Sequence, residues 1–186
     1  MRRRRILRRA SLRPASLQPL GPRVRTLLLR AHQLQATGQH LAAAQLFEQL
    51  AEGAQKRSLP QAPQLQIQAA RAYLLAGEKE KGISNLTAAF DALIQEGHED
   101  RILSIAPRIQ RFLHTNQLDD VWHVIHSMLQ EHNIVLDPAF ISQPNALRLP
   151  SKCPYCGGTL NPSEVEHTAG GGVVCLYCGS VVQGDE

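Results

Sequence analysis

The chain has 186 residues, enough for one ordinary domain with or without a small additional module. Hydrophobic residues make up 43% of it and aromatic residues only 4%, so a packed core has to be built mainly from Leu, Ile, Val and Ala. Leu and Ala favour helices, which makes a mainly α-helical fold the first expectation. No run of about eighteen apolar residues is present, so a membrane-spanning helix is not expected.

The formal net charge of +4 is unevenly distributed along the chain. Residues 1–30 hold ten arginines and no acidic residue, whereas the rest of the chain holds ten basic and sixteen acidic residues. The N-terminal segment is therefore strongly basic, and the body of the protein is mildly acidic. An electrostatic argument for a nucleic-acid partner applies only to the N-terminal segment.

Residues 1–23 are predicted to be a disordered basic tail. Seven arginines lie within residues 2–13, and prolines and a glycine follow them, so the segment can neither sustain a long helix nor bury much apolar surface. Such a tail can bind RNA, DNA, an anionic membrane or an acidic protein, and charge does not choose between them. The Arg-rich, acid-free start also resembles an organelle transit peptide, an alternative to the cytoplasmic location that we expect.

Residues 24–133 are predicted to be helical, and their pattern recurs at intervals of thirty-nine residues. A turn residue recurs at Gly38, Gly77 and Asn116. Five positions after each turn, a small or short residue recurs at Ala43, Gly82 and Val121. Nine positions after each turn, a large apolar residue recurs at Phe47, Leu86 and Ile125. Each unit is typical of two helices joined by a turn, because Gly and Asn tolerate the left-handed conformation that ends a helix. Stacking is expected, since a single hairpin cannot bury its apolar face.

The first two units, residues 31–47 and 70–86, resemble tetratricopeptide repeats. A third copy, residues 109–125, departs from the family pattern at Asn116 and Val121, and the interval exceeds the family's usual length of about thirty-four residues. The resemblance implies an antiparallel array of about three helical hairpins. A plain helical bundle is the alternative.

In such an array the first helix of each pair lines a concave groove that receives a peptide. The resemblance implies that the following side chains project into this groove: Arg25, His32, Gln35, Gln64, Arg71, Gln110 and His114. The Lys and Asn set with which the family clamps a terminal carboxylate is not reproduced, so a C-terminal peptide is not the expected ligand. The alternative is that these residues only cover solvent-facing helix surfaces.

After a Pro-containing linker at residues 134–150, residues 151–186 are rich in Gly and in short β-prone runs. Two C-x-x-C pairs, separated by eighteen residues, supply Cys153, Cys156, Cys175 and Cys178. Zn²⁺ prefers four tetrahedral ligands and binds thiolates well, and a glycine such as Gly157 after each pair permits a tight turn. The segment resembles a rubredoxin-type zinc ribbon, which implies one structural Zn²⁺ held by the four cysteines.

Other assignments of the site remain open. The same four sulfurs can hold iron, or the cysteines can form a disulfide or redox pair. His167 lies between the two pairs and is expected to be a bystander, because four cysteines already complete the shell. Lys152 is the one basic residue from Pro150 onward, against four acidic residues, so we do not expect the ribbon itself to bind nucleic acid.

The sequence favours a non-enzymatic adaptor that binds a partner protein on its helices and carries the ribbon as a second docking module. No catalytic motif stands out, and His123 and His126 are interpreted as ordinary surface residues rather than a second metal site. The alternative is a nucleic-acid-associated protein that uses residues 2–13. An accessory subunit of an enzyme complex would have the same sequence features, and neither the partner nor the oligomeric state follows from the sequence.

Overall fold

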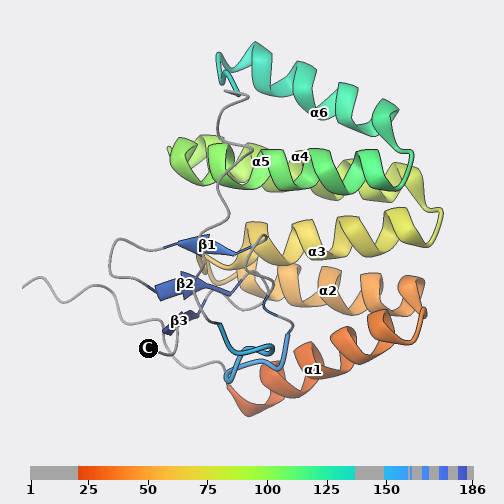
Figure 1. The fold of residues 1–186 in the computed structure, drawn as a ribbon, viewed down its shortest axis with the longest axis vertical. Coiled ribbons are helices and arrows are strands. Elements are labelled where there is room, and N and C mark those ends of the chain that lie inside the picture. Colours follow the sequence, from red (N-terminus) through yellow and green to blue (C-terminus); the bar gives the residue numbers. More distant parts are fainter. Residues whose placement is uncertain are drawn as a thin grey trace, which may run out of the picture.

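The computed structural model describes residues 21–136, 149–158, 160, 165–167, 172–175 and 180–183. Within these residues six helices come first and three short strands follow (Figure 1). The mainly helical fold with a small C-terminal sheet is therefore confirmed at this level. The predicted tail up to Leu20, most of the predicted linker and Cys178 lie outside the described residues.

The helices form three antiparallel hairpins. They pair as α1 (Pro22–Ala36) with α2 (His40–Gln55), α3 (Ala62–Leu75) with α4 (Lys79–Gln95), and α5 (Glu99–Thr115) with α6 (Asp119–Glu131) (Figure 1). The first helix begins with Pro22, a residue suited to the first helical turn, two positions before the predicted boundary. Among the described residues, no helix is both long and apolar enough to cross a bilayer.

The turns inside the hairpins agree with the sequence pattern twice and depart from it once. Gly38 and Gly77 have positive φ angles of 76° and 83°, as expected for the residue that ends a helix. The prediction for Asn116 was wrong: its φ is −98°, and Gln117 takes the positive φ of 58° instead. Helix α5 runs to Thr115 and Asn116 is its C-cap residue, so the left-handed turn falls one residue later than the pattern predicted. The Nδ2 of Asn116 donates to the carbonyl of Phe112 at 2.7 Å.

The positions that recur in the sequence do form the interior of the array. Phe47, Leu86 and Ile125 are all 0% exposed. Gly82 lies where α4 crosses α3, and a Cβ atom added to it would lie 2.5 Å from Cγ of Leu74. A small residue is therefore required at this crossing, as the repeat pattern predicted.

Two glycines inside helices are expected to respond to substitution in opposite ways. Gly82→Val forces a branched side chain against Leu74 and should lower the free energy of unfolding by about 1–3 kcal/mol. Gly53→Ala meets no atom within 4 Å and improves helix propensity, so it should raise the free energy of unfolding by about 0.5–1 kcal/mol. Chemical denaturation of both variants tests this pair, and equal effects would contradict the close crossing of α3 and α4.

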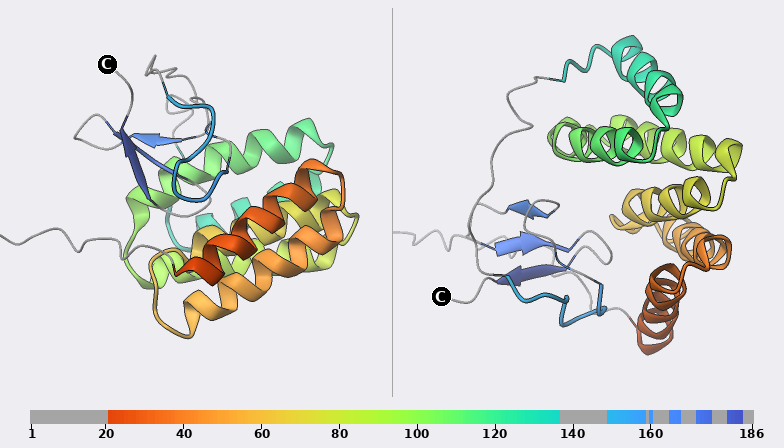
Figure 2. Two further views of the ribbon diagram at one scale, coloured as in Figure 1. Left: turned by 90° about the horizontal axis from the view of Figure 1, so that it is seen from below. Right: turned by 45° about the vertical axis from the view of Figure 1, so that its right-hand side comes forward.

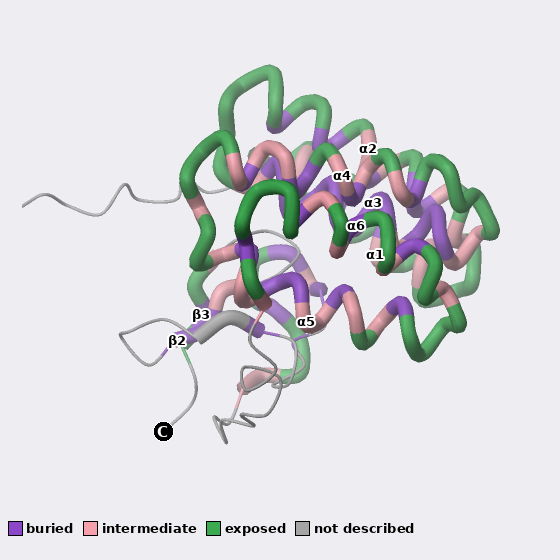
Figure 3. The backbone as a smooth tube through the Cα atoms, turned by 90° about the horizontal axis from the view of Figure 1, so that it is seen from above, coloured by how far each residue is buried: buried purple, intermediate pink, exposed green. Residues whose placement is uncertain are grey.

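Helix α3 is the centre of the array. It packs between α2 and α4, and its residues are buried on nearly every face (Figure 3). Burial includes three glutamines, Gln64, Gln66 and Gln68, which are the buried polar side chains among the described residues. Buried amides need hydrogen-bond partners, so apolar packing alone does not explain why glutamines occupy these three positions.

The three strands are β1 (Glu166–His167), β2 (Gly172–Val174) and β3 (Val181–Gln183), and they form one antiparallel sheet in the order β1-β2-β3. Val173 lies opposite His167 on one side and Val182 on the other. The right-hand view of Figure 2 shows the helices stacked along a curve, with the sheet on the inner side of that curve.

The ribbon packs directly on the helical array. Its buried residues Cys153, Val173 and Val182 belong to the same hydrophobic cluster as Leu28 of α1 and Ala69 of α3. A second cluster, built from α3 to α6, contains no described ribbon residue. The described residues of the C-terminal segment therefore share a core with the first three helices.

Candidate metal centre

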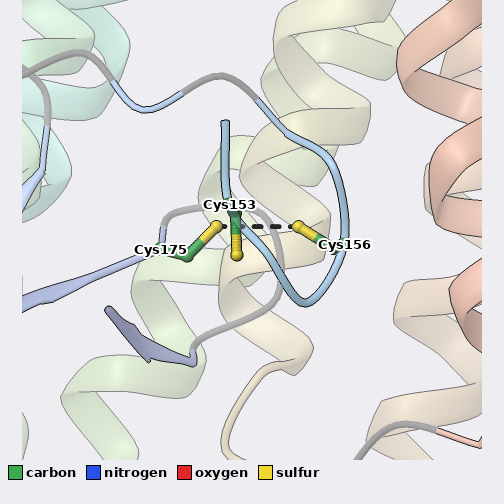
Figure 4. A group of neighbouring side chains, drawn as sticks. All are labelled: Cys153, Cys156 and Cys175. Atoms are coloured by element: carbon green, nitrogen blue, oxygen red, sulfur yellow. Dashed lines mark hydrogen bonds between the residues drawn. The ribbon is translucent and has the colours of Figure 1, made fainter. Parts of the chain in front are cut away.

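Three cysteines form a compact buried group. The Sγ atoms of Cys153, Cys156 and Cys175 all lie within 4.8 Å of one another, and the side chains are 2%, 0% and 0% exposed (Figure 4). None of the three is in a disulfide. This group can hold a metal ion, because thiolates are strong ligands for soft and borderline metals.

The backbone near these cysteines is folded into tight turns. The amide of Cys153 donates to Gly158 at 2.7 Å and the amide of Gly157 donates to Cys153 at 2.8 Å, which closes a turn around the first C-x-x-C pair. Gly157 has a φ of +74°, so the predicted need for glycine there is confirmed. On the second side, the amide of Cys175 donates to Ser180 at 2.8 Å.

One pair of sulfurs has the spacing expected of two ligands on a tetrahedral ion. Two thiolates bound to one tetrahedral zinc at about 2.3 Å have their sulfurs about 3.8 Å apart. Cys156 Sγ and Cys175 Sγ lie 3.7 Å apart, far beyond the length of a disulfide bond of about 2.05 Å. The donor set and its spacing therefore suit a metal better than a cystine, and Cys178, the fourth predicted ligand, lies outside the described residues.

His32 of α1 lies near the cysteine group and was not predicted to do so. Burial lowers its pKa to about 4, and the charge of Cys153 partly opposes this shift. Its ring also contacts Phe47 edge-on, with centroids 5.1 Å apart. A neutral imidazole from the helical array therefore borders the metal centre at neutral pH. No local sequence pattern indicates this contact, because His32 and Cys153 are 121 positions apart.

The predicted groove residues have different surroundings, and their role in one groove stays a prediction. Arg25 donates to Pro154 of the ribbon at 3.3 Å, and Arg25 and His32 thus lie at the ribbon side of α1. Gln35 and Gln110 are partly exposed. His114 is exposed and its Nδ1 lies 3.0 Å from Asp119 Oδ1.

Gln64 and Arg71 instead border a small cleft between α3 and α5. Gln64 is only 4% exposed and accepts a hydrogen bond from Arg101 at 3.3 Å, so it differs from the expected solvent-facing residue. Arg71 stacks its guanidinium over the ring of Phe112 at 4.7 Å. The cleft has a volume of about 30 Å³, and its lining is mixed polar and apolar: Gln64, Ile67, Gln68, Arg71, Ile105, Arg108 and Ile109.

Sequence reasoning missed Gln68, the second polar residue in this cleft. Gln68 is 2% exposed, and its Oε1 has no hydrogen-bond partner among the described residues. The Nε atom of Arg71 likewise has none in the described part of the chain. No sequence signal separates Gln68 from the other glutamines of this helix, because its burial depends on contacts with other helices.

The remaining candidate histidines add no described ligand to the metal centre. His126 packs against Trp122 with ring centroids 5.8 Å apart, and His123 is exposed on the same helix, far along the chain from the cysteines. For His167 the structure describes only the backbone, which belongs to β1. Comparison of the chain with protein-family models, with curated proteins and with solved structures gives no match.

Proposed function

We propose that this chain is a non-enzymatic adaptor, in which tetratricopeptide-like hairpins bind a partner protein and a rubredoxin-type zinc ribbon completes the scaffold. The cleft between α3 and α5 is the observation that carries the proposal. It combines three isoleucines with the polar atoms of Gln68 and Arg71 that have no described partner. Apolar lining with a few convergent polar groups is typical of a surface that receives a side chain of another protein.

The ribbon determines which part of the inner face remains for a partner. Arg25 and His32, two of the seven residues expected in the groove, contact the ribbon or lie beside its cysteines. The docking surface we propose is therefore shorter than a full groove and centres on Arg71. Arginine is a frequent contributor to binding energy at interfaces because its planar guanidinium both stacks and donates several hydrogen bonds.

The docking proposal is tested by quantitative capture with chemical crosslinking, using the full chain as bait. A partner bound at the α3–α5 cleft should crosslink beside Arg71, and Arg71→Gln should weaken its binding by about tenfold or more. Arg57→Gln, on the exposed turn after α2, is the matched control and should bind as the wild type does. Retention of the partner by the Arg71 variant, with an unchanged melting curve, would place the docking surface elsewhere.

We further propose that the metal is one zinc ion and that Cys178 supplies its fourth ligand. Four protein thiolates would fill the coordination shell and leave no position for a substrate, so the ion would act by holding the fold together. Elemental analysis of the purified full chain should give about one equivalent of zinc per chain. If elemental analysis found iron instead of zinc, and the protein absorbed visible light, iron would be supported as the bound metal.

A second function, association with nucleic acid, is favoured by the seven arginines in residues 2–13. If each neutralises one phosphate, the slope of log affinity against log salt should reach about −6 for a duplex. Replacing Arg2, Arg3, Arg4 and Arg5 by Gln should reduce that slope by about 3 to 4. Titration of RNA and DNA duplexes across a salt series measures this, and absence of binding near physiological salt would leave the protein-docking role alone.

A further inference from the structure

A groove between α2 and α4 is lined by hydrogen-bond acceptors and lies apart from both the metal centre and the α3–α5 cleft. Its volume is about 180 Å³, with two carboxylates, two amides and a hydroxyl among its lining residues: Glu48, Ala51, Glu52, Gln66, Ser84, Asn85 and Ala88. Helix α3 contributes only Gln66, which lies between the two walls formed by α2 and α4.

Glu48 is held in a fixed position in this groove. Tyr73 donates its phenol hydrogen to Oε2 at 2.7 Å, and the amide of Asn85 donates to Oε1 at 3.2 Å. Burial, and then the hydrogen bond to Glu48, raise the pKa of Tyr73 well above its ordinary value, so the phenol remains a neutral donor. A carboxylate oriented by two donors still has lone pairs that can accept further hydrogen bonds. Because it is already ordered, ligand binding loses little additional conformational entropy at this side chain.

Gln66 is the second, independent sign of a ligand. Its side chain is 8% exposed, and its Oε1 accepts no hydrogen bond from any residue that the structure describes. Such an atom is costly to bury unless a donor reaches it. Glu52 adds a second negative charge at the rim, where its contact with Lys56 is long, 3.9 Å, and exposed.

These groups call for a cation with several donors rather than for a metal ion. Within the described residues, the one close group of three or more metal-ligating side chains is the cysteine group. A guanidinium has five N–H donors in a plane and no acceptor, and it pairs with carboxylates and amide oxygens at once. The side chain of arginine is therefore the ligand that best matches this groove.

The chain itself carries a source of arginine, which joins the helical array at the end nearest Glu48 and Glu52. Seven arginines and no acidic residue lie in residues 2–13, and this segment joins the start of α1. Because α1 and α2 are antiparallel, α1 begins at the end of the hairpin where α2 finishes, and Glu48 and Glu52 lie in the second half of α2 (Figure 1). The twenty residues before Gly21 can span at most about 66 Å, and a tether of this length gives an effective concentration near the millimolar range.

We propose that the groove formed by Glu48, Glu52 and Gln66 binds an arginine side chain from residues 2–13 of the same chain. The carboxylates of the groove then pair with arginines of the basic segment when no anion that binds these arginines more strongly is present. This contact is separate from the adaptor role and from zinc, so its test involves neither a partner protein nor the metal.

The test uses the full chain with all seven arginines of residues 2–13 replaced by Gln, and a synthetic peptide of residues 1–13 as the probe. Calorimetric titration at low salt should show binding of the peptide to this neutralised chain. The wild-type chain should bind the peptide about tenfold more weakly, because its own segment competes for the groove. Equal binding to both chains, or no binding to either, would overturn the proposal.

Substitutions in the neutralised chain locate the contact. Glu48→Gln removes a charge-assisted hydrogen bond and should lower the affinity for the peptide by about tenfold. Glu52 is exposed, so the Glu52→Gln chain should still fold, and its affinity for the peptide should fall by about three-fold. Glu131→Gln, an exposed carboxylate on α6, is the matched control and should leave the affinity unchanged. If all three variants bound the peptide equally, attraction to overall charge would replace the groove as the explanation.

Discussion

Removing the metal from the full chain should loosen the first helical hairpin together with the ribbon. Cys153 and Cys175 belong to the same hydrophobic cluster as Leu28 and Ala31 of α1, so the C-terminal segment and this helix share one core. Structural zinc contributes about 10–16 kcal/mol to the folding of small zinc modules, so a metal-free ribbon is expected to unfold. Its loss exposes the apolar face of α1 that it covers.

Hydrogen exchange measured by mass spectrometry distinguishes the two outcomes. In the chelated chain, exchange in α1 should accelerate by about tenfold or more, whereas α5 and α6, which belong to the second cluster, should remain protected. Cys153→Ser should reproduce the effect, and returning zinc to the chelated wild type should reverse it. Unchanged protection of α1 without metal would mean that the ribbon contributes little to the helical array.

Replacing Gly157 by Ala is expected to be the most damaging single methyl addition in the ribbon. An Ala side chain at a φ of +74° costs about 1–2 kcal/mol. The new Cβ would also lie 2.4 Å from Cδ2 of Leu29, the end of a half-exposed side chain that can turn away, and moving it off its rotamer costs about 0.5–1.5 kcal/mol more. The free energy of unfolding should therefore fall by about 1.5–3.5 kcal/mol.

A double-mutant cycle separates the two costs. Leu29→Ala alone removes a half-exposed side chain and should cost less than about 1 kcal/mol. In the Gly157→Ala background it removes the clash, so the double variant should be more stable than Gly157→Ala alone, while the backbone cost remains. Strict additivity in chemical denaturation would argue against the contact between this turn and α1.

Local patterns in the sequence were sufficient for the helical hairpins and for the cysteines that the structure brings together. The thirty-nine-residue interval placed Phe47, Leu86 and Ile125 in the interior, because helical periodicity and small residues at crossings are properties of neighbouring positions. The C-x-x-C pairs likewise brought Cys153 and Cys156 together, since a tight turn with Gly157 is a local structure. One turn was misplaced by one residue, because α5 runs to Thr115 and the positive φ therefore falls at Gln117 rather than Asn116.

The sequence by itself thus determined the helical hairpins, the cysteine set and the separation of charge between the N-terminal segment and the rest of the chain. Only the tertiary structure decided that the ribbon lies on the inner side of the helical array, that His32 borders the cysteines, and that Gln66 and Gln68 are buried beside cavities. These contacts join residues far apart in the chain. They depend on how the surfaces of separate elements fit together, and no periodicity or spacing within one segment encodes that fit.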